Sequence, residues 1–239
     1  MNLPSLSSGH FIFQGHPAAW NTISKHIKVK TFSKEESVLC HGDDAHSLFV
    51  MLQGWVSLTR QTPDGKETIT GLLTEGDVFG EASLFPNASY PYNAAAVDDS
   101  TQIAIIPSRI MREAIKNDKE FSTGIMGLLN ERLTKTQLKL EHLSTLSAAQ
   151  RMGCFLLNLC KDTSHGSKTI HIPVGKNIIA AYLGMKAETF SRSLQQLKDV
   201  GIKASGHTID IEKIEDLRDF VCNSCSEFGA CDTNTYTHS

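Results

Sequence analysis

The first half of the chain alternates between short apolar runs and turn residues. The runs are rich in β-branched and aromatic residues, as expected for strands, and they cover residues 28–32, 36–41, 46–52, 55–60, 67–73, 93–97 and 101–107. The turn signals between them are Gly42-Asp43, Gly54, Pro63-Asp64-Gly65 and Gly76-Asp77. Evenly spaced short strands of this kind predict a double-sheet jelly roll. A short helical piece is expected before them, around Pro17 to Ile27.

The second half of the chain changes to helical spacing. Ser108 is expected to cap a short helix that runs to Ile115, and a long helix follows from about Asp118 to Leu143. In that long helix, residues at three- and four-residue steps form one stripe: Leu129, Leu133, Thr136, Leu140 and Leu143. The stripe is buried either against the protein's own domain or against the same helix of a second chain.

Residues 146–221 predict a helical domain that ends in a hairpin and a final helix. Ser147 begins a helix over residues 148–160, and the residues expected to face its core are Met152, Phe155, Leu156 and Leu159. Gly201 starts the hairpin IKASGHTIDI, with Gly206-His207 near its tip. The segment EKIEDLRDFV closes the domain as a helix.

The stretch from Val174 to Val200 predicts a helix, a tight turn and a second helix. The first helix covers Lys176 to Tyr182, and Gly184 lies in the turn, where glycine adopts conformations that cost other residues more. The second helix runs from about Ala187 to Asp199, with two faces: apolar Phe190, Leu194 and Leu197, and polar Glu188, Ser191 and Arg192. A helix-turn-helix places such polar residues in the DNA major groove, where arginine binds guanine and glutamate accepts from cytosine. An ordinary helical hairpin with a solvated polar face is the alternative.

The string ETFSR, Glu188 to Arg192, resembles the recognition helix of the CRP/FNR superfamily, as do the leucines that follow it. Its Glu-x-x-Ser-Arg pattern is similar to the FNR-type version, whereas the CRP-type version has glycine in place of Ser191 and arginine in place of Ala187. The resemblance covers about Val29 to Val221 and implies DNA half-sites related to TTGAT. It also implies that the long helix is a dimerisation helix, which sets two half-sites about one DNA turn, ~34–36 Å, apart.

The expected DNA-binding residues extend beyond the polar face of the second helix. They are Glu188, Thr189, Ser191, Arg192, Lys176 at the start of the first helix, and His207 at the tip of the hairpin. The hairpin is the wing of a winged helix-turn-helix domain, so its tip is expected to contact DNA beside the recognition helix.

The segment FGEASLF, Phe79 to Phe85, resembles the phosphate-binding segment of a cyclic-nucleotide-binding β-roll, the effector domain of the same superfamily. In members that bind cAMP, a glutamate binds the ribose and an arginine some ten residues later binds the phosphate. Gly80 and Glu81 match this segment and are the candidate effector-pocket residues, but no arginine lies between Arg60 and Arg109. A buried phosphate without a cationic partner is costly. Cyclic nucleotide binding is therefore not expected, and Glu81 is expected to be a structural residue.

Composition is consistent with a two-domain DNA-binding protein. The 239 residues suffice for two domains, and the 40% hydrophobic content is typical of globular proteins. The net charge is −3, yet residues 146–221 hold 10 Lys and Arg against 8 Asp and Glu. Because this surplus is small, affinity for DNA should depend on a dimer and on specific contacts. No apolar run predicts a membrane span and no basic leader predicts a signal peptide, so a cytoplasmic protein is expected.

Three of the six cysteines form the pattern C-x2-C-x5-C just after the last expected helix: Cys222, Cys225 and Cys231. Thiolates this close together favour a soft metal or an iron–sulfur cluster. The tail is similar to that of Bacillus-type FNR proteins, which carry three C-terminal cysteines and a carboxylate ligand, and this implies a [4Fe–4S] cluster with a fourth, non-cysteine ligand. The cysteines expected to be buried small apolar groups within strands or helices are Cys40, Cys154 and Cys160.

Other interpretations of the cysteine tail stay open. They are a zinc site completed by His238, a thiol–disulfide switch at Cys222 and Cys225, and a tail with incidental cysteines. The recognition-helix pattern also resembles DNR-type regulators, which sense nitric oxide through haem, so haem is an alternative cofactor. A thiol oxidoreductase would need the Cys-x-x-Cys motif at a helix start within a βαβ unit. Here the motif follows a helix near the end of the sequence, so no enzyme activity is expected.

These patterns together predict an α+β protein with four parts. The parts are a cyclic-nucleotide-binding-type β-roll (1–117), a long dimerisation helix (118–145), a winged helix-turn-helix domain (146–221) and a Cys-containing tail (222–239). We expect a homodimeric transcription regulator that binds double-stranded DNA and RNA polymerase, not membranes, and that switches between two states in response to oxygen, nitric oxide or another redox signal. A nucleotide-binding module without DNA binding is the alternative.

Overall fold

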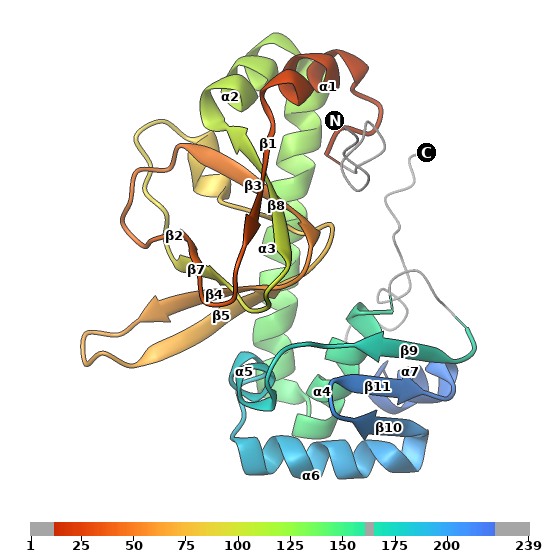
Figure 1. Ribbon diagram of the computed structural model, residues 1–239. Helices are drawn as coiled ribbons and strands as arrows, with labels where there is room; N and C mark the ends of the chain where they lie inside the picture. The colour runs from red at the N-terminus through yellow and green to blue at the C-terminus, as the bar shows by residue number, and fades with distance from the viewer. Residues whose placement is uncertain (1–11, 161–164, 223–239) are drawn as a thin grey trace. The chain divides into compact units, whose positions relative to one another are not determined.

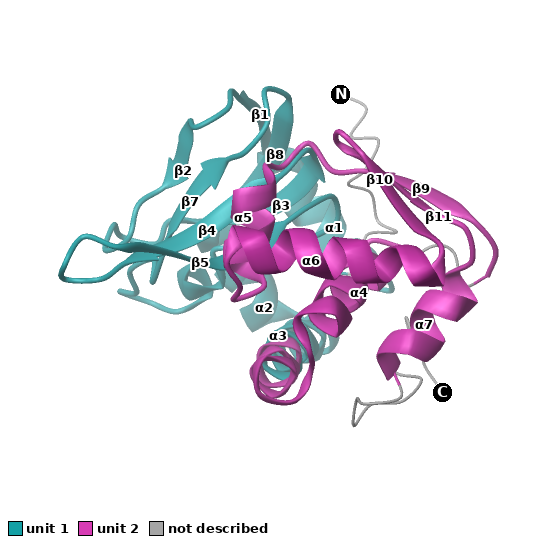
Figure 2. Cartoon of the chain, turned by 90° about the horizontal axis from the view of Figure 1, so that it is seen from below, with its two compact units in different colours: residues 1–134 teal, residues 135–239 magenta. Residues whose placement is uncertain are grey.

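The computed structural model describes residues 12–160 and 165–222, and Figure 1 shows their helices and strands. The chain divides into two compact units, residues 1–134 and residues 135–239, which Figure 2 shows in separate colours. Unit 1 is a β-roll with helices at both ends of its sequence, and unit 2 contains the helix-turn-helix. The predicted α+β fold is therefore confirmed, including the long helix between the two parts.

Unit 1 contains two four-stranded antiparallel sheets, with strand orders β1-β8-β3-β6 and β2-β7-β4-β5. The strand bounds are β1 Lys28–Phe32, β2 Ser37–Leu39, β3 Ser47–Gln53, β4 Val56–Gln61, β5 Glu67–Leu73, β6 Val78–Phe79, β7 Asn93–Ala96 and β8 Thr101–Pro107. The predicted runs 28–32, 67–73 and 101–107 coincide with β1, β5 and β8. Runs rich in β-branched residues between turn residues thus located these strands correctly.

Strand β3 explains how the two cores of unit 1 are built. Successive side chains of a strand point to opposite faces, so Phe49 and Met51 join one core cluster while Leu48 and Val50 join the other. The first cluster draws on strands of both sheets, and Phe49 stacks on Phe79 of β6 with ring centroids 4.9 Å apart. The second cluster lies against helices. A strand buried on both faces requires a continuous apolar run, which SLFVML supplies.

The helices of unit 1 cover the second face of β3. They are α1 (Pro17–Ile23), the 3-10 turn η1 (Ser24–His26), α2 (Ser108–Asn117) and the first part of α3 (Lys119–Thr145). Ser108 does not cap α2 as predicted: Pro107 is the N-cap residue, and the Ser108 N–H donates to the His46 carbonyl at 2.8 Å. The next helix, α3, does have a side-chain cap: Asp118 Oδ1 accepts the Phe121 N–H at 2.9 Å.

Unit 2 is a helical domain with a small sheet. Its elements after α3 are α4 (Ala148–Asn158), β9 (Lys168–His171), α5 (Lys176–Tyr182), α6 (Ala187–Leu197), the 3-10 turn η3 (Lys198–Val200), β10 (Ile202–Ser205), β11 (Thr208–Ile211) and α7 (Ile214–Cys222). The expected start of α4 at Ser147 is confirmed by a capping box, in which Ser147 and Gln150 bond each other's backbone N–H groups. The expected hairpin is β10–β11, and β9 pairs with β11 to extend it to three strands.

Two strands and two cysteines differ from the sequence predictions. β6 has only two residues directly after the Gly76-Asp77 turn, and β9 pairs only with distant β11, so neither has a local signature. Cys40 is exposed and follows the end of β2, so the prediction that it is buried is wrong. Cys160 is buried but lies two residues beyond α4, where burial raises the pKa of its thiol.

Candidate nucleic-acid interface

The turn between α5 and α6 has the geometry of a Schellman motif. Gly184 adopts a left-handed conformation with φ of 65°. Its N–H donates to the Ala181 carbonyl at 3.1 Å, and the Met185 N–H donates to the Ala180 carbonyl at 3.0 Å. These bonds satisfy the last carbonyls of α5 and turn the chain sharply into α6. Gly184 therefore lies in the turn in a left-handed conformation, as its sequence position predicted.

Helix α6 separates its buried and polar residues cleanly. Phe190, Ser193 and Leu197 are at most 2% exposed, whereas the neighbouring polar residues are exposed: Glu188, Thr189, Ser191 and Arg192. Ser193 was not predicted to be buried, and Leu194, which was, is only partly covered. A serine is small enough to lie where two helices approach closely. The exposed first turns of α6 offer a carboxylate, two hydroxyls and a guanidinium to a partner.

The remaining predicted DNA-binding residues also lie on the surface of unit 2. Lys176 is the exposed first residue of α5, and His207 is exposed in the turn of the β10–β11 hairpin. His207 Nδ1 lies 3.2 Å from the Ile172 carbonyl, and its ring lies 6.2 Å from that of His171. Ser191 Oγ donates to the Ala187 carbonyl at 3.1 Å, which leaves the hydroxyl oxygen as an acceptor.

Arg151 of α4 holds the helix-turn-helix in place. Its Nε donates to the Leu183 carbonyl at 3.0 Å, and its Nη1 donates to the Leu146 carbonyl at 2.8 Å. One guanidinium therefore joins the turn before α6 to the segment between α3 and α4. Sequence reasoning missed this residue, although a lone arginine inside the apolar run of α4 is a signal for a buried bridging role.

The last turns of α3 also contact the helix-turn-helix. Lys139 Nζ lies 3.8 Å from the ring centroid of Tyr182, an arrangement that supplies a cation–π interaction. A Cβ on Gly184 would lie 2.8 Å from Leu143 Cδ2, so the turn passes close to α3. Within unit 2, the position of α6 is thus determined by contacts from both α3 and α4.

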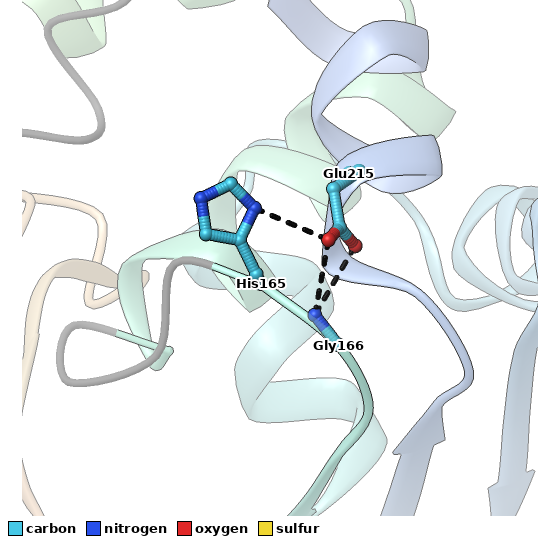
Figure 3. Close-up of polar contacts among 3 residues, drawn as sticks. All are labelled: His165, Gly166 and Glu215. Carbon is cyan, nitrogen blue, oxygen red and sulfur yellow. Dashed lines mark hydrogen bonds and ion pairs between the residues drawn. The ribbon is translucent and has the colours of Figure 1, made fainter.

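Helix α7 is attached at both of its ends. Near its start, both carboxylate oxygens of Glu215 accept the Gly166 N–H, at 3.1 and 3.2 Å, and one of them lies 3.2 Å from His165 Nδ1 (Figure 3). Backbone hydrogen bonds, first from its own N–H and then from Gly166, hold the pKa of Glu215 below its ordinary value. At the other end Val221 is fully buried, and a Cβ added to Gly153 of α4 would collide with it. Helices α7 and α4 therefore pack with no space between them.

Of the three cysteines expected to bind a cluster, Cys222 is the last residue of α7 and is 3% exposed. Cys225 and Cys231 lie outside the described residues. Within residues 12–160 and 165–222, no three His, Cys, Asp or Glu side chains gather into a metal-binding group. The expected cluster site therefore has one described member, Cys222, and stays a prediction.

The predicted effector-pocket residues lie at a sharp bend of the β-roll. Gly80 has φ of 80°, and a Cβ there would lie 2.8 Å from Phe49 Cδ2. Glu81 begins the 3-10 turn η2 (Glu81–Leu84), and its side chain is 15% exposed. Its carboxylate contacts Tyr92, eleven residues further along the chain, and Arg132 on α3, and sequence reasoning missed both contacts. The expectation that Glu81 is structural stays a prediction.

The fold and the exposed face of α6 together define a class: regulators with a β-roll and a DNA-binding helix-turn-helix. Comparison with protein families agrees, since residues 29–118 match the cyclic nucleotide-binding domain and residues 150–220 match the Crp-like helix-turn-helix domain. No helix within the described residues is long and apolar enough to cross a membrane.

Known proteins resemble the chain over most of its length. The global nitrogen regulator of Nostoc sp. is 29% identical over 72% of this chain and 78% of its own. The cAMP-activated global transcriptional regulator CRP of Pasteurella multocida is 27% identical over 77% of this chain and 90% of its own. The structure of a Ruegeria pomeroyi protein provisionally assigned to cyclic nucleotide binding is 31% identical, covers 86% of this chain and 90% of its own, and superposes with a TM-score of 0.69.

The chain belongs to the CRP/FNR family of DNA-binding transcription regulators. The curated relatives above are transcription regulators and not enzymes. The name of the Pasteurella regulator states its signal, cAMP, whereas the name of the Nostoc regulator states none. The family therefore establishes the mode of action, DNA binding, and leaves the signal to be argued from this chain's own residues.

Proposed function

We propose that this regulator binds a TTGAT-like palindrome as a homodimer, with α6 of each protomer in the major groove. The observation that supports it is the exposed face of Glu188, Ser191 and Arg192, which matches the FNR-type pattern. Arg192 would bind a guanine through two donors, and Glu188 would accept from a cytosine amine. Lys176 and His207 would contact the DNA backbone on either side, which positions α6 without selecting bases.

The apolar stripe of α3 supports the homodimer. Leu133, Leu140 and Leu143 are 56%, 62% and 43% exposed in the single chain, and large apolar groups in such a row favour contact with a second copy. Pairing α3 with its twin would set the two recognition helices about one DNA turn apart. Sedimentation of the Leu133→Glu, Leu140→Glu double variant tests this role, because a charge in the stripe should yield monomers that have lost DNA affinity.

DNA binding is tested by band shifts on a TTGAT palindrome and on duplexes with one base pair changed in each half-site. Each wrong base pair should weaken binding by about 1–3 kcal/mol per half-site. Equal affinity for every duplex would contradict the proposed recognition. RNA polymerase is the further partner we propose, since a regulator of this family acts at promoters.

The proposed signal is redox chemistry or a gas, oxygen or nitric oxide, received by the cysteine tail. Cys222, Cys225 and Cys231 would hold a [4Fe–4S] cluster, which supplies an oxidisable centre when bound. What supports this is the C-x2-C-x5-C spacing and the place of Cys222 at the end of α7. Because α7 packs tightly on α4, and Arg151 of α4 holds the turn before α6, a change at Cys222 would reach the recognition helix through two contacts.

Protein purified without oxygen tests the cofactor. A broad visible absorption with iron and sulfide indicates the cluster, and a sharp Soret band indicates haem. The absence of both leaves a zinc site, a thiol–disulfide switch or no role at all. The variant Cys222→Ser, Cys225→Ser, Cys231→Ser should lose iron and regulation together. Cys154→Ser is the control, since Cys154 is also a buried cysteine of unit 2 but lies in α4, and it should keep both. Normal regulation by the triple variant would exclude the tail as the sensor.

A further inference from the structure

Polar side chains meet in the β-roll at the place where the family resemblance puts a cyclic nucleotide. The Tyr92 hydroxyl donates to Glu81 Oε2 at 3.2 Å and accepts the Gly80 N–H at 2.9 Å. Arg132 of α3 contributes its Nε, 3.4 Å from Glu81 Oε1. Both oxygens of the Glu81 carboxylate and the N–H of Gly80 are therefore engaged by groups of the chain itself.

Tyr92 is suited to this position chemically. It lies eleven residues after Glu81, in the region where cAMP-binding members carry their phosphate-binding arginine. Burial, reinforced by the charge of Glu81, raises the pKa of Tyr92, so its hydroxyl stays protonated and donates to the carboxylate. A tyrosine cannot neutralise a phosphate, but it can occupy the donor site that a ligand hydroxyl would otherwise fill.

Arg132 connects this cluster to the helix that leads to the DNA-binding unit. α3 is continuous from Lys119 to Thr145. Arg132 lies on it seven residues before Lys139, which contacts Tyr182 of the helix-turn-helix. Seven residues of α-helix span about 10 Å. The Arg132–Glu81 ion pair and the Lys139–Tyr182 contact therefore lie about two turns apart on the same helix.

We propose that Tyr92 is a built-in substitute for an effector, and that the Tyr92–Glu81–Arg132 cluster holds α3 in the DNA-binding arrangement without any ligand in the β-roll. The inference rests on the proposed DNA binding. It assigns Tyr92 and Arg132 as positioning residues for that activity. It also implies that the regulatory signal acts outside the β-roll, because the polar groups of Gly80 and Glu81 already have partners within the chain.

The test compares DNA affinity, and unfolding without DNA, for Tyr92→Phe, Arg132→Gln and the double variant. Each single variant should raise the dissociation constant for the palindrome at least fivefold, in the range of typical allosteric couplings. The double variant should raise it little further, because both changes break one unit. Arg132→Lys should recover part of the affinity, since it restores the positive charge, and added cAMP should change no value.

Tyr90→Phe is the matched control. Tyr90 is also a buried tyrosine of the same segment, but its hydroxyl bonds the Ser47 backbone and not Glu81. It should lower the unfolding temperature and leave the dissociation constant unchanged. Single variants that fold and bind DNA within twofold of the unaltered protein would overturn the proposal, as would activation by cAMP. If the unaltered protein binds no palindrome, the DNA-binding proposal fails, and additive unfolding effects of Tyr92→Phe and Arg132→Gln would separately refute the cluster.

Discussion

The first turns of α6 and the Gly80–Glu81 bend of the β-roll both present a glutamate near an arginine, with opposite outcomes. On α6, Glu188 and Arg192 are exposed one helical turn apart and available to a partner. In the roll, Glu81 is largely covered and its carboxylate is shared between Tyr92 and Arg132. The same two chemical groups thus form an exposed polar surface in one unit and a largely covered ion pair in the other. Exposure, and not residue type, separates the two environments.

The largest expected effect is on the external surface. Arg192→Ala removes one bidentate contact in each half-site, so the dimer should lose about 2–6 kcal/mol of binding free energy and its preference at one guanine. Band shifts on the palindrome and on duplexes altered at that guanine measure both losses. Arg109→Ala is the control, since it removes the same charge from the exposed surface of α2. If both variants weaken binding equally, Arg192 contributes only general electrostatic attraction.

The next largest effect concerns Arg151, which holds the helix-turn-helix from within unit 2. Arg151→Met removes the hydrogen bonds to the Leu183 and Leu146 carbonyls, so the free energy of unfolding should fall by about 2 kcal/mol. Urea denaturation measures it. Lys213→Met, at an exposed position of unit 2, should have almost no effect. Similar midpoints for the two variants would show that Arg151 is not a structural bridge.

A smaller effect is expected at the turn before α6. Gly184→Ala places a side chain in a left-handed conformation and near Leu143, which should cost about 1–2 kcal/mol of stability. Gly206→Ala has the same backbone strain with nothing within 4 Å, so its cost should be the lower of the two. Thermal unfolding of both variants isolates the contribution of the Leu143 contact. A larger loss for Gly206→Ala would contradict the close approach of the turn to α3.

Sequence periodicity predicted the elements whose signals are local. Strands β1, β5 and β8 follow from β-rich runs between turn residues. The helix-turn-helix follows from helical spacing and a glycine in the turn. The predicted exposure of Glu188, Ser191 and Arg192 needed only the helical repeat, and their DNA contacts stay predictions. The cluster around Glu81 was not predictable, because Tyr92 and Arg132 meet it only after the roll has folded and α3 has packed. The burial of Cys40 was wrongly predicted because β2 ends at Leu39, two residues before the end of the predicted run, and Cys40 lies exposed beyond it.

The smallest expected effect concerns pH and the attachment of α7. Since hydrogen bonds lower the folded-state pKa of Glu215, its contribution is fully present above the ordinary carboxyl range and is lost as pH falls below about 4. Glu215→Gln should therefore lower the unfolding temperature slightly at pH 7 and have less effect at pH 3.5. Thermal melts at the two pH values test this. A variant that is equally destabilised at both would show that the charge of Glu215 is unimportant.

The burial of Cys222 has a consequence for how fast the protein could respond. Cys222 is 3% exposed at the end of α7 and Val221 beside it is fully buried, so we expect a reagent in solution to reach the sulfur when this last turn opens. Local opening then precedes chemistry, so the opening rate limits the rate of modification. At low reagent concentration the modification rate rises with concentration, and at high concentration it levels off at the opening rate. If the cysteine tail is the sensor, as proposed, the rate at which this turn opens would set the fastest response to an oxidant.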